Sequence, residues 1–176
     1  MGKRKPQKPF FYSEELTPWN KVFIKIYAGL TLAILLICLF GPVEAKPPFL
    51  IVYITVSHLS IYFLLCAALR NFKFYLIWIA FSCVHIIIYF LLHSNNEFVM
   101  PRGNATNGLL NTVILLLLYQ FLRWLSFKEH NREFVVPAKM SDKGLWENTK
   151  TSAFDYIILM IYMASVCGLT ILATHY

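Results

Sequence analysis

The most regular feature of the chain is a series of long apolar stretches separated by short polar segments. The five stretches are residues 22–41, 49–69, 73–92, 109–127 and 154–174. Each has about the 20 residues that an α-helix needs to cross the hydrocarbon core of a bilayer. Because they are apolar all round, they have no polar face to turn to water. The pattern therefore predicts an all-α, multi-pass membrane protein with five transmembrane helices.

Residues typical of helix ends lie at the boundaries of these stretches. Thr17 and Pro18 supply an N-cap and a first-turn proline just before the first stretch. We expect residues 22–174 to form a single membrane domain, preceded by a tail at residues 1–21. The longest polar segment, the loop at residues 128–153, is too short to be a domain of its own.

Lysine and arginine are distributed unevenly between the two sides that five spans would create. Fourteen of the sixteen fall on the side of the tail: Lys3, Arg4, Lys5, Lys8, Lys21, Lys25, Arg70, Lys73, Arg123, Lys128, Arg132, Lys139, Lys143 and Lys150. The other side holds Lys46 and Arg102. By the positive-inside rule the N-terminus is cytoplasmic and the C-terminus is lumenal or extracellular. The net charge of +7 then reflects topology, and no nucleic-acid partner is expected.

The side predicted to be cytoplasmic also carries aromatic residues. Phe10, Phe11 and Tyr12 follow the basic cluster of the tail, and the polar loop contains Phe134 and Trp146. Ordinary orientation signals with an aromatic belt explain the tail, and specific lipid recognition is the alternative. An isolated protein would have to cover such aromatics, which indicates a partner. Candidate contacts to lipid headgroups or to a partner are Lys3, Arg4, Lys5, Arg70, Lys73, Arg123 and Trp146.

Two histidines are the strongest candidates for chemistry, because an ionisable residue inside a span is a functional-site hypothesis by default. His58 and His85 lie at similar depths in two consecutive stretches that should be antiparallel neighbours. They could ligate haem b, relay protons or hold a metal. The simpler interpretation, which we favour, is hydrogen bonding between packed helices. We therefore expect no cofactor and no metal.

Arg123 raises a second pair of alternatives at the end of the fourth stretch. It could pair with Asp155 at the start of the fifth stretch and tie the two helices together. Alternatively, its side chain could extend to the headgroups, as long cationic side chains do.

Small residues mark two candidate helix-packing faces, Gly29 with Ala33 and Ala164 with Gly168. Small residues four apart let helix backbones approach closely. Asn104 begins a glycosylation sequon on the side predicted to be lumenal. The sequon and the short spans indicate a eukaryotic endomembrane, the endoplasmic reticulum first.

Motifs of known enzyme classes are missing from the sequence. It contains no HExxH, nucleophile elbow, P-loop or CxxC pair. No resemblance to a known family extends over a useful length. We predict a non-enzymatic accessory or scaffold subunit of a larger endomembrane complex. The alternatives are a phospholipid-handling or lipid-transfer accessory protein, and a haem b or proton-transfer subunit that uses His58 and His85.

Overall fold

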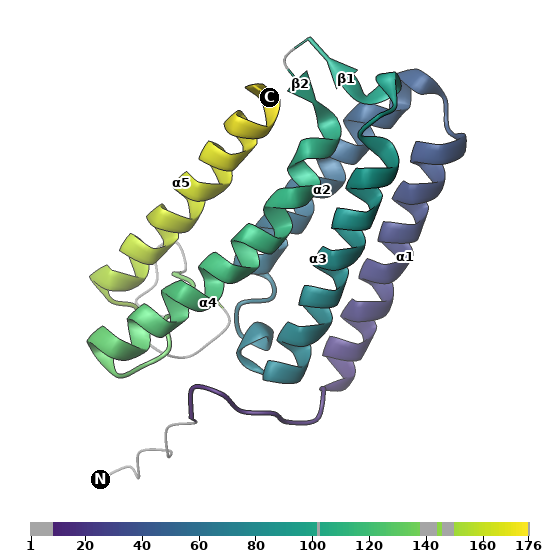
Figure 1. The fold of residues 1–176 in the computed structure, drawn as a ribbon. Coiled ribbons are helices and arrows are strands. Elements are labelled where there is room, and N and C mark those ends of the chain that lie inside the picture. The colour runs from purple at the N-terminus through teal and green to yellow at the C-terminus, as the bar shows by residue number, and fades with distance from the viewer. Residues whose placement is uncertain (1–8, 102, 138–143, 146–149, 176) are drawn as a thin grey trace, which may run out of the picture.

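The computed structural model describes residues 9–101, 103–137, 144–145 and 150–175, and the protein is mostly helical, at 77%. Five long helices form a bundle (Figure 1): α1 (Pro18–Phe40), α2 (Lys46–Phe63), α3 (Phe72–Leu92), α4 (Asn111–His130) and α5 (Ala153–His175). The all-α prediction is confirmed at this level.

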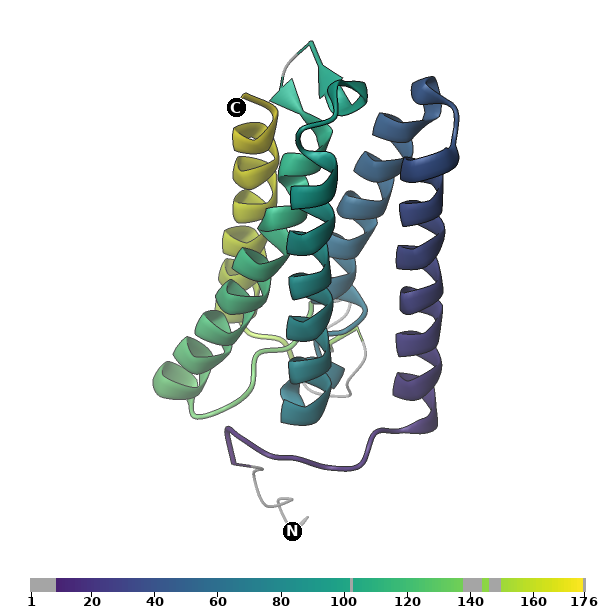
Figure 2. The same ribbon diagram turned by 45° about the vertical axis from the view of Figure 1, so that its right-hand side comes forward.

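The order of the helices across the bundle places α1 and α5 on opposite sides. α1 packs against α2 and α3, whereas α5 packs against α4 and the 3-10 helix η4 (Ala105–Leu110), as Figure 2 also shows. The described N-terminal segment and the end of α5 lie at opposite ends of the bundle (Figure 1). We call the end that carries residues 9–17, the α2–α3 turn and the α4–α5 connection the basic end. The other is the opposite end.

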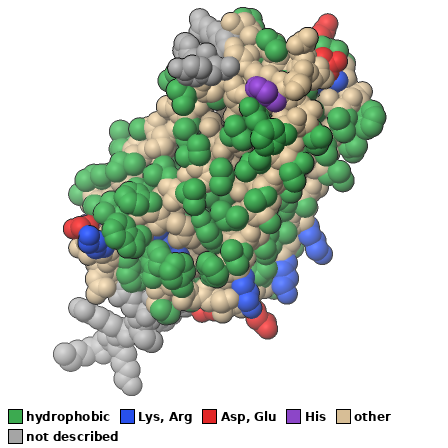
Figure 3. All heavy atoms as spheres, viewed as in Figure 1, with side chains coloured by type: hydrophobic (Ala, Val, Ile, Leu, Met, Phe, Trp, Pro, Cys, Tyr) green, Lys and Arg blue, Asp and Glu red, His purple; other side chains and the backbone are tan. Residues whose placement is uncertain are grey.

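The surface of the bundle is that of an integral membrane protein. Four helical stretches are long and apolar enough to cross a membrane: Pro18–Phe40, Phe72–Leu92, Ala105–His130 and Ala153–Ala173. Apolar side chains cover the flank of the molecule in Figure 3, and blue lysine and arginine side chains gather toward the basic end. The multi-pass prediction is therefore confirmed for four helices.

The second predicted stretch differs from a continuous span. α2 has eighteen residues, ends at Phe63 instead of residue 69, and is not among the four helices that qualify. Its apolar sequence continues because the following turn is buried. Leu65 and Cys66 are almost inaccessible, and the Tyr119 hydroxyl donates a 2.6 Å hydrogen bond to the Cys66 carbonyl. Apolar character in this turn reports burial by protein, which hydropathy does not distinguish from burial in lipid.

Short elements close the opposite end of the bundle. The 3-10 helices η1 (Val43–Ala45) and η3 (Asn96–Phe98) precede a two-stranded antiparallel ribbon, β1 (Val99–Met100) and β2 (Gly103–Asn104). A Cβ added to Gly108 in η4 would lie 3.0 Å from the Ile54 side chain. This glycine lets η4 approach α2 closely and brings the start of α4 to the bundle interior.

The basic end is closed by two segments that fold onto the helices. The N-terminal segment crosses beneath the bundle (Figure 1), and the Phe72 amide donates to the Tyr12 carbonyl at 2.9 Å. After α4, Phe134 turns back into the core beside Tyr62 and is 1% exposed. The expectation that Phe134 is exposed and needs a partner to cover it is therefore wrong, because the chain's own helices cover it. Trp146 lies outside the described residues.

Candidate functional site

A continuous polar network lies in the middle of the bundle, surrounded by apolar side chains. Four helices contribute to it, and all its members are at most 7% exposed. They are Tyr27 and Thr31 of α1, Tyr53, Ser57 and His58 of α2, His85 of α3 and Thr112 of α4. We refer to these seven residues as the interior network.

His85 is the centre of the interior network and is completely buried. Its Nε2 atom lies 2.7 Å from the Tyr53 hydroxyl and 3.3 Å from the Tyr27 hydroxyl. Its Nδ1 atom lies 2.9 Å from Oγ1 of Thr112. The Tyr53 hydroxyl is also 2.7 Å from Oγ1 of Thr31. One imidazole thus joins α1, α2 and α4 to its own helix.

His58 lies beside His85 and shares a partner with it. Its Nε2 atom is 3.4 Å from Oγ1 of Thr112, near the limit for a hydrogen bond. It also hydrogen-bonds to the backbone of Gly108, and its own carbonyl accepts from the Tyr162 hydroxyl at 2.9 Å. The structure therefore brings both histidines to Thr112 and adds α5 to the connections.

The interior network consists only of groups that can be neutral, which suits a low-dielectric interior. An unpaired polar group there is expensive, so satisfied hydrogen bonds both stabilise the bundle and fix its packing. A series of hydrogen bonds runs from His58 through Thr112, His85 and Tyr53 to Thr31. Each of these groups can act as donor or acceptor, so the direction of the bonds could change. Toward the basic end the interior network is followed by a layer of aromatic rings, in which Tyr62 stacks on Tyr162 and Phe134, and Tyr119 meets Phe134 edge to face.

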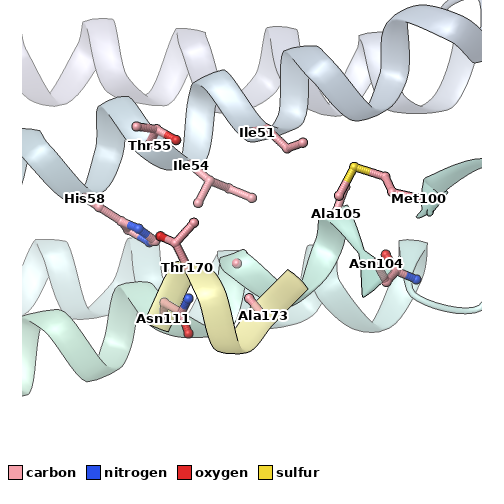
Figure 4. Close-up of a pocket in the computed structure, with 11 residues that line it drawn as sticks. Ile51, Ile54, Thr55, His58, Met100, Asn104, Ala105, Asn111, Thr170 and Ala173 are labelled. Carbon is pink, nitrogen blue, oxygen red and sulfur yellow. The ribbon is translucent and has the colours of Figure 1, made fainter. Parts of the chain in front are cut away.

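A small cavity of about 60 Å³ adjoins His58 on the side of the opposite end. Figure 4 shows the His58 ring beside Thr170 of α5 and Asn111 of α4, with Ile54 one turn earlier than His58 on α2. This volume could hold a few water molecules, because a water needs roughly 10–15 Å³ of such space.

Haem b does not fit the two histidines. Both ring nitrogens of His85 are engaged by side-chain hydroxyls, and the cavity beside His58 is far smaller than the roughly 300 Å³ at which ligand pockets begin. Within the described residues there is also no group of three or more histidine, cysteine, aspartate or glutamate side chains that could hold a metal.

A second polar cluster, at the basic end, is ionic. The Arg123 side chain is 1% exposed, and its Nε donates to both carboxylate oxygens of Glu133, at 3.0 and 2.9 Å. Its Nη2 donates to the same carboxylate at 2.7 Å and to the Phe10 carbonyl, while the Phe10 ring lies 4.4 Å from its guanidinium carbon. We refer to Arg123, Glu133 and the ion pair of Asp155 with Arg132 as the ionic cluster.

Both expectations for Arg123 are wrong in this structure. The guanidinium does not extend to the headgroups, because Glu133 and Phe10 enclose it. Nor does it pair with Asp155, whose buried carboxylate accepts from Arg132, from the Val135 amide at 3.1 Å and from Ser152. The connection after α4 thus neutralises Arg123 through Glu133 and neutralises Asp155 through Arg132.

The other predicted contact residues lie partly within the described structure. Lys73 is exposed, whereas Arg70 is mostly buried and donates to the Phe134 carbonyl at 2.6 Å. Outside the described residues lie Lys3, Arg4, Lys5 and Trp146.

The predicted glycosylation site, Asn104, is 9% exposed, and its amide nitrogen donates to the His93 carbonyl at 3.1 Å. Glycosylation at Asn104 stays a prediction.

Both small-residue pairs face outward. Gly29 and Ala33 on α1 are exposed, as are Ala164 and Gly168 on α5. A Cβ added to Gly29 or Gly168 would meet nothing within 4 Å. Helix packing inside this chain therefore does not use these faces.

Several functional-looking residues escape sequence reasoning. Tyrosine and threonine are common in apolar helices. Nothing in the spacing of Tyr27, Tyr53 and Thr112 shows that they meet at His85. Glu133 could have been suspected, since a buried arginine needs a carboxylate and few acidic residues lie near Arg123 in the sequence.

No protein-family model, curated protein or solved structure matches this chain.

Proposed function

We propose that this protein is a non-enzymatic accessory subunit of a larger membrane-protein complex, and that it acts by presenting α1 and α5 to partner helices. In this proposal all five helices cross the membrane, the basic end is cytoplasmic and the membrane is the endoplasmic reticulum. The short, partly polar α2 is then sheltered by α1, α4 and η4.

The outward position of the small-residue pairs is the observation that carries the proposal. In lipid, helices associate through close backbone approach, and small residues make it possible. Gly29 and Gly168 lie on the two outermost helices, on opposite sides of the bundle, with open space beside them. A partner helix could approach either backbone without rearranging this chain.

The interior network supports a structural role over a catalytic one. Its side chains bond mainly to each other, and its hydrogen bonds cross between helices, as expected of polar groups that hold a bundle together. Proton transfer is the weaker alternative, because the aromatic layer of Tyr62, Phe134 and Tyr119 lies between His58 and the basic end. The phospholipid-handling alternative rests on a different feature, a hollow at the basic end.

The test is a pull-down of the tagged native protein in mild detergent, with mass spectrometry and an absorption spectrum on the same sample. The proposal expects a stoichiometric membrane-protein partner and no haem absorption. Gly29→Ile and Gly168→Ile should fold normally, and at least one should lose the partner, because a branched side chain keeps helices apart.

The matched control is Ala80→Ile, which adds a branched side chain at an exposed position of α3. It should leave the partner bound. Recovery of the protein without a stoichiometric partner, or retention of the partner by both glycine variants, would refute the proposal. A haem spectrum would establish the histidine alternative instead.

A further inference from the structure

A hollow of about 480 Å³ lies at the basic end, between the N-terminal segment, the first turns of α1 and the α2–α3 turn. This volume falls within the roughly 300–1,000 Å³ typical of ligand pockets. Hydrogen bonds hold its walls together. The Asn71 amide nitrogen donates to the Glu14 carbonyl at 2.9 Å, and the Asn20 amide donates to the Thr17 hydroxyl at 3.2 Å.

The charge of the hollow is opposite to that of the protein. Glu14 and Glu15 line it, together with Tyr12 and Trp19, and the described residues that line it include no lysine or arginine. Carboxylates attract ammonium groups, and aromatic faces bind them through cation–π interactions. An anionic headgroup, by contrast, would meet two like charges.

The same hollow has features that suit a phosphate and an acyl chain. It adjoins the N-terminus of α1, the positive end of a 23-residue helix, and Lys21 is exposed next to the lining residue Asn20. Phe23, Leu64 and Leu65 give it an apolar side. Trp19 is 75% exposed, and tryptophan favours the headgroup level of a bilayer.

We infer that this hollow binds the headgroup of a zwitterionic phospholipid that carries a primary or quaternary ammonium group, and we call this class the amine lipids. The ammonium lies against Glu14, Glu15 and the Trp19 ring, the phosphate lies near the start of α1 and Lys21, and an acyl chain follows Phe23 into the membrane. This inference does not depend on the partner contacts of α1 and α5 proposed above.

The test is native mass spectrometry of the purified full-length chain with an equimolar mixture of phosphatidylethanolamine, phosphatidylcholine and phosphatidylglycerol. Adducts of one or both amine lipids should form at lower concentration than phosphatidylglycerol adducts. Glu14→Gln with Glu15→Gln should weaken amine-lipid binding about tenfold, the loss expected when a charge-assisted contact is removed. Trp19→Ala should weaken it in the same direction.

Glu44→Gln is the matched control, since Glu44 is an exposed carboxylate at the opposite end. It should leave the lipid preference unchanged, and every variant should still unfold cooperatively because the substituted side chains are exposed. Equal binding of phosphatidylglycerol by the wild type, or an unchanged preference in the double variant, would overturn the inference.

Discussion

The interior network and the ionic cluster both place polar side chains inside the protein, but they use different chemistry. Among the described residues, the interior network joins its helices through imidazole and hydroxyl groups. The ionic cluster places Arg123 and Asp155 at about 1% exposure or less, each with an oppositely charged partner from the connection between α4 and α5. One is at the middle of the bundle and the other is at its basic end.

The difference follows from the dielectric environment along the helices. A charge near the centre of a membrane costs several kcal/mol even by the most lenient scales, whereas the cost falls toward the interface. Neutral groups can therefore be buried deeply as long as their hydrogen bonds are satisfied. Full charges are found where a loop can bring a counter-charge, as Glu133 does for Arg123.

The largest effect should come from breaking the ionic cluster. Arg123→Met leaves the Glu133 carboxylate without its closest counter-charge, and we expect a loss of about 3 kcal/mol in unfolding free energy. The measurement is thermal unfolding in mild detergent, followed by circular dichroism. Arg123→Met with Glu133→Leu should recover part of the loss, since the carboxylate that the single variant leaves without Arg123 is then removed as well.

Lys128→Met is the control for this prediction, because it removes an exposed charge from the same helix. Its effect should stay within about 0.5 kcal/mol. If Arg123→Met were as mild as Lys128→Met, the guanidinium would not be buried as described.

A smaller effect should come from the interior network. His85→Leu leaves the Tyr53 and Thr112 hydroxyls without their imidazole partner, and we expect a loss of about 2 kcal/mol. His58→Leu should cost less, about 1 kcal/mol, because its contact with Thr112 is long at 3.4 Å. The same unfolding measurement ranks the two, and a larger loss for His58 would contradict the central position of His85.

The smallest effect should come from the ion pair at the opposite end. The Lys46 ammonium, 2.6 Å away, together with the Asn95 amide, holds the pKa of Glu97 below its ordinary value. This contribution to stability is therefore complete above the ordinary glutamate pKa and is lost as the pH falls through the lower pKa of the folded state. Glu97→Gln should slightly reduce the fall of the unfolding free energy at acidic pH. An unchanged dependence of the unfolding free energy on pH would count against the ion pair.

The sequence predicts the helices well and their contacts poorly. Hydropathy locates α1, α3, α4 and α5 because the length of a continuous apolar stretch is a local property of the chain. It extends the second stretch to residue 69 because protein-buried Leu65 and Cys66 are as apolar as lipid-facing residues.

Side-chain partners depend on how helices rotate against each other, and this is not encoded in a one-dimensional pattern. Helical depth alone places His58 near His85, whereas the meeting of Tyr27 and Tyr53 at the same ring requires the packed structure. Arg123 shows the same limit. Its spacing suggested Asp155, yet the turn after α4 brings Glu133 closer.

The N-terminal segment has a consequence for the timing of synthesis. Phe10 leaves the ribosome more than a hundred residues before Arg123 and Glu133, the groups on which its carbonyl and ring finally rest. Until the fourth helix and the turn after it have been made, Phe10 lacks these partners, although Tyr12 can already pair with Phe72. Phe10 is thus among the last residues of that segment to reach its place, and its docking reports that α4 has been completed.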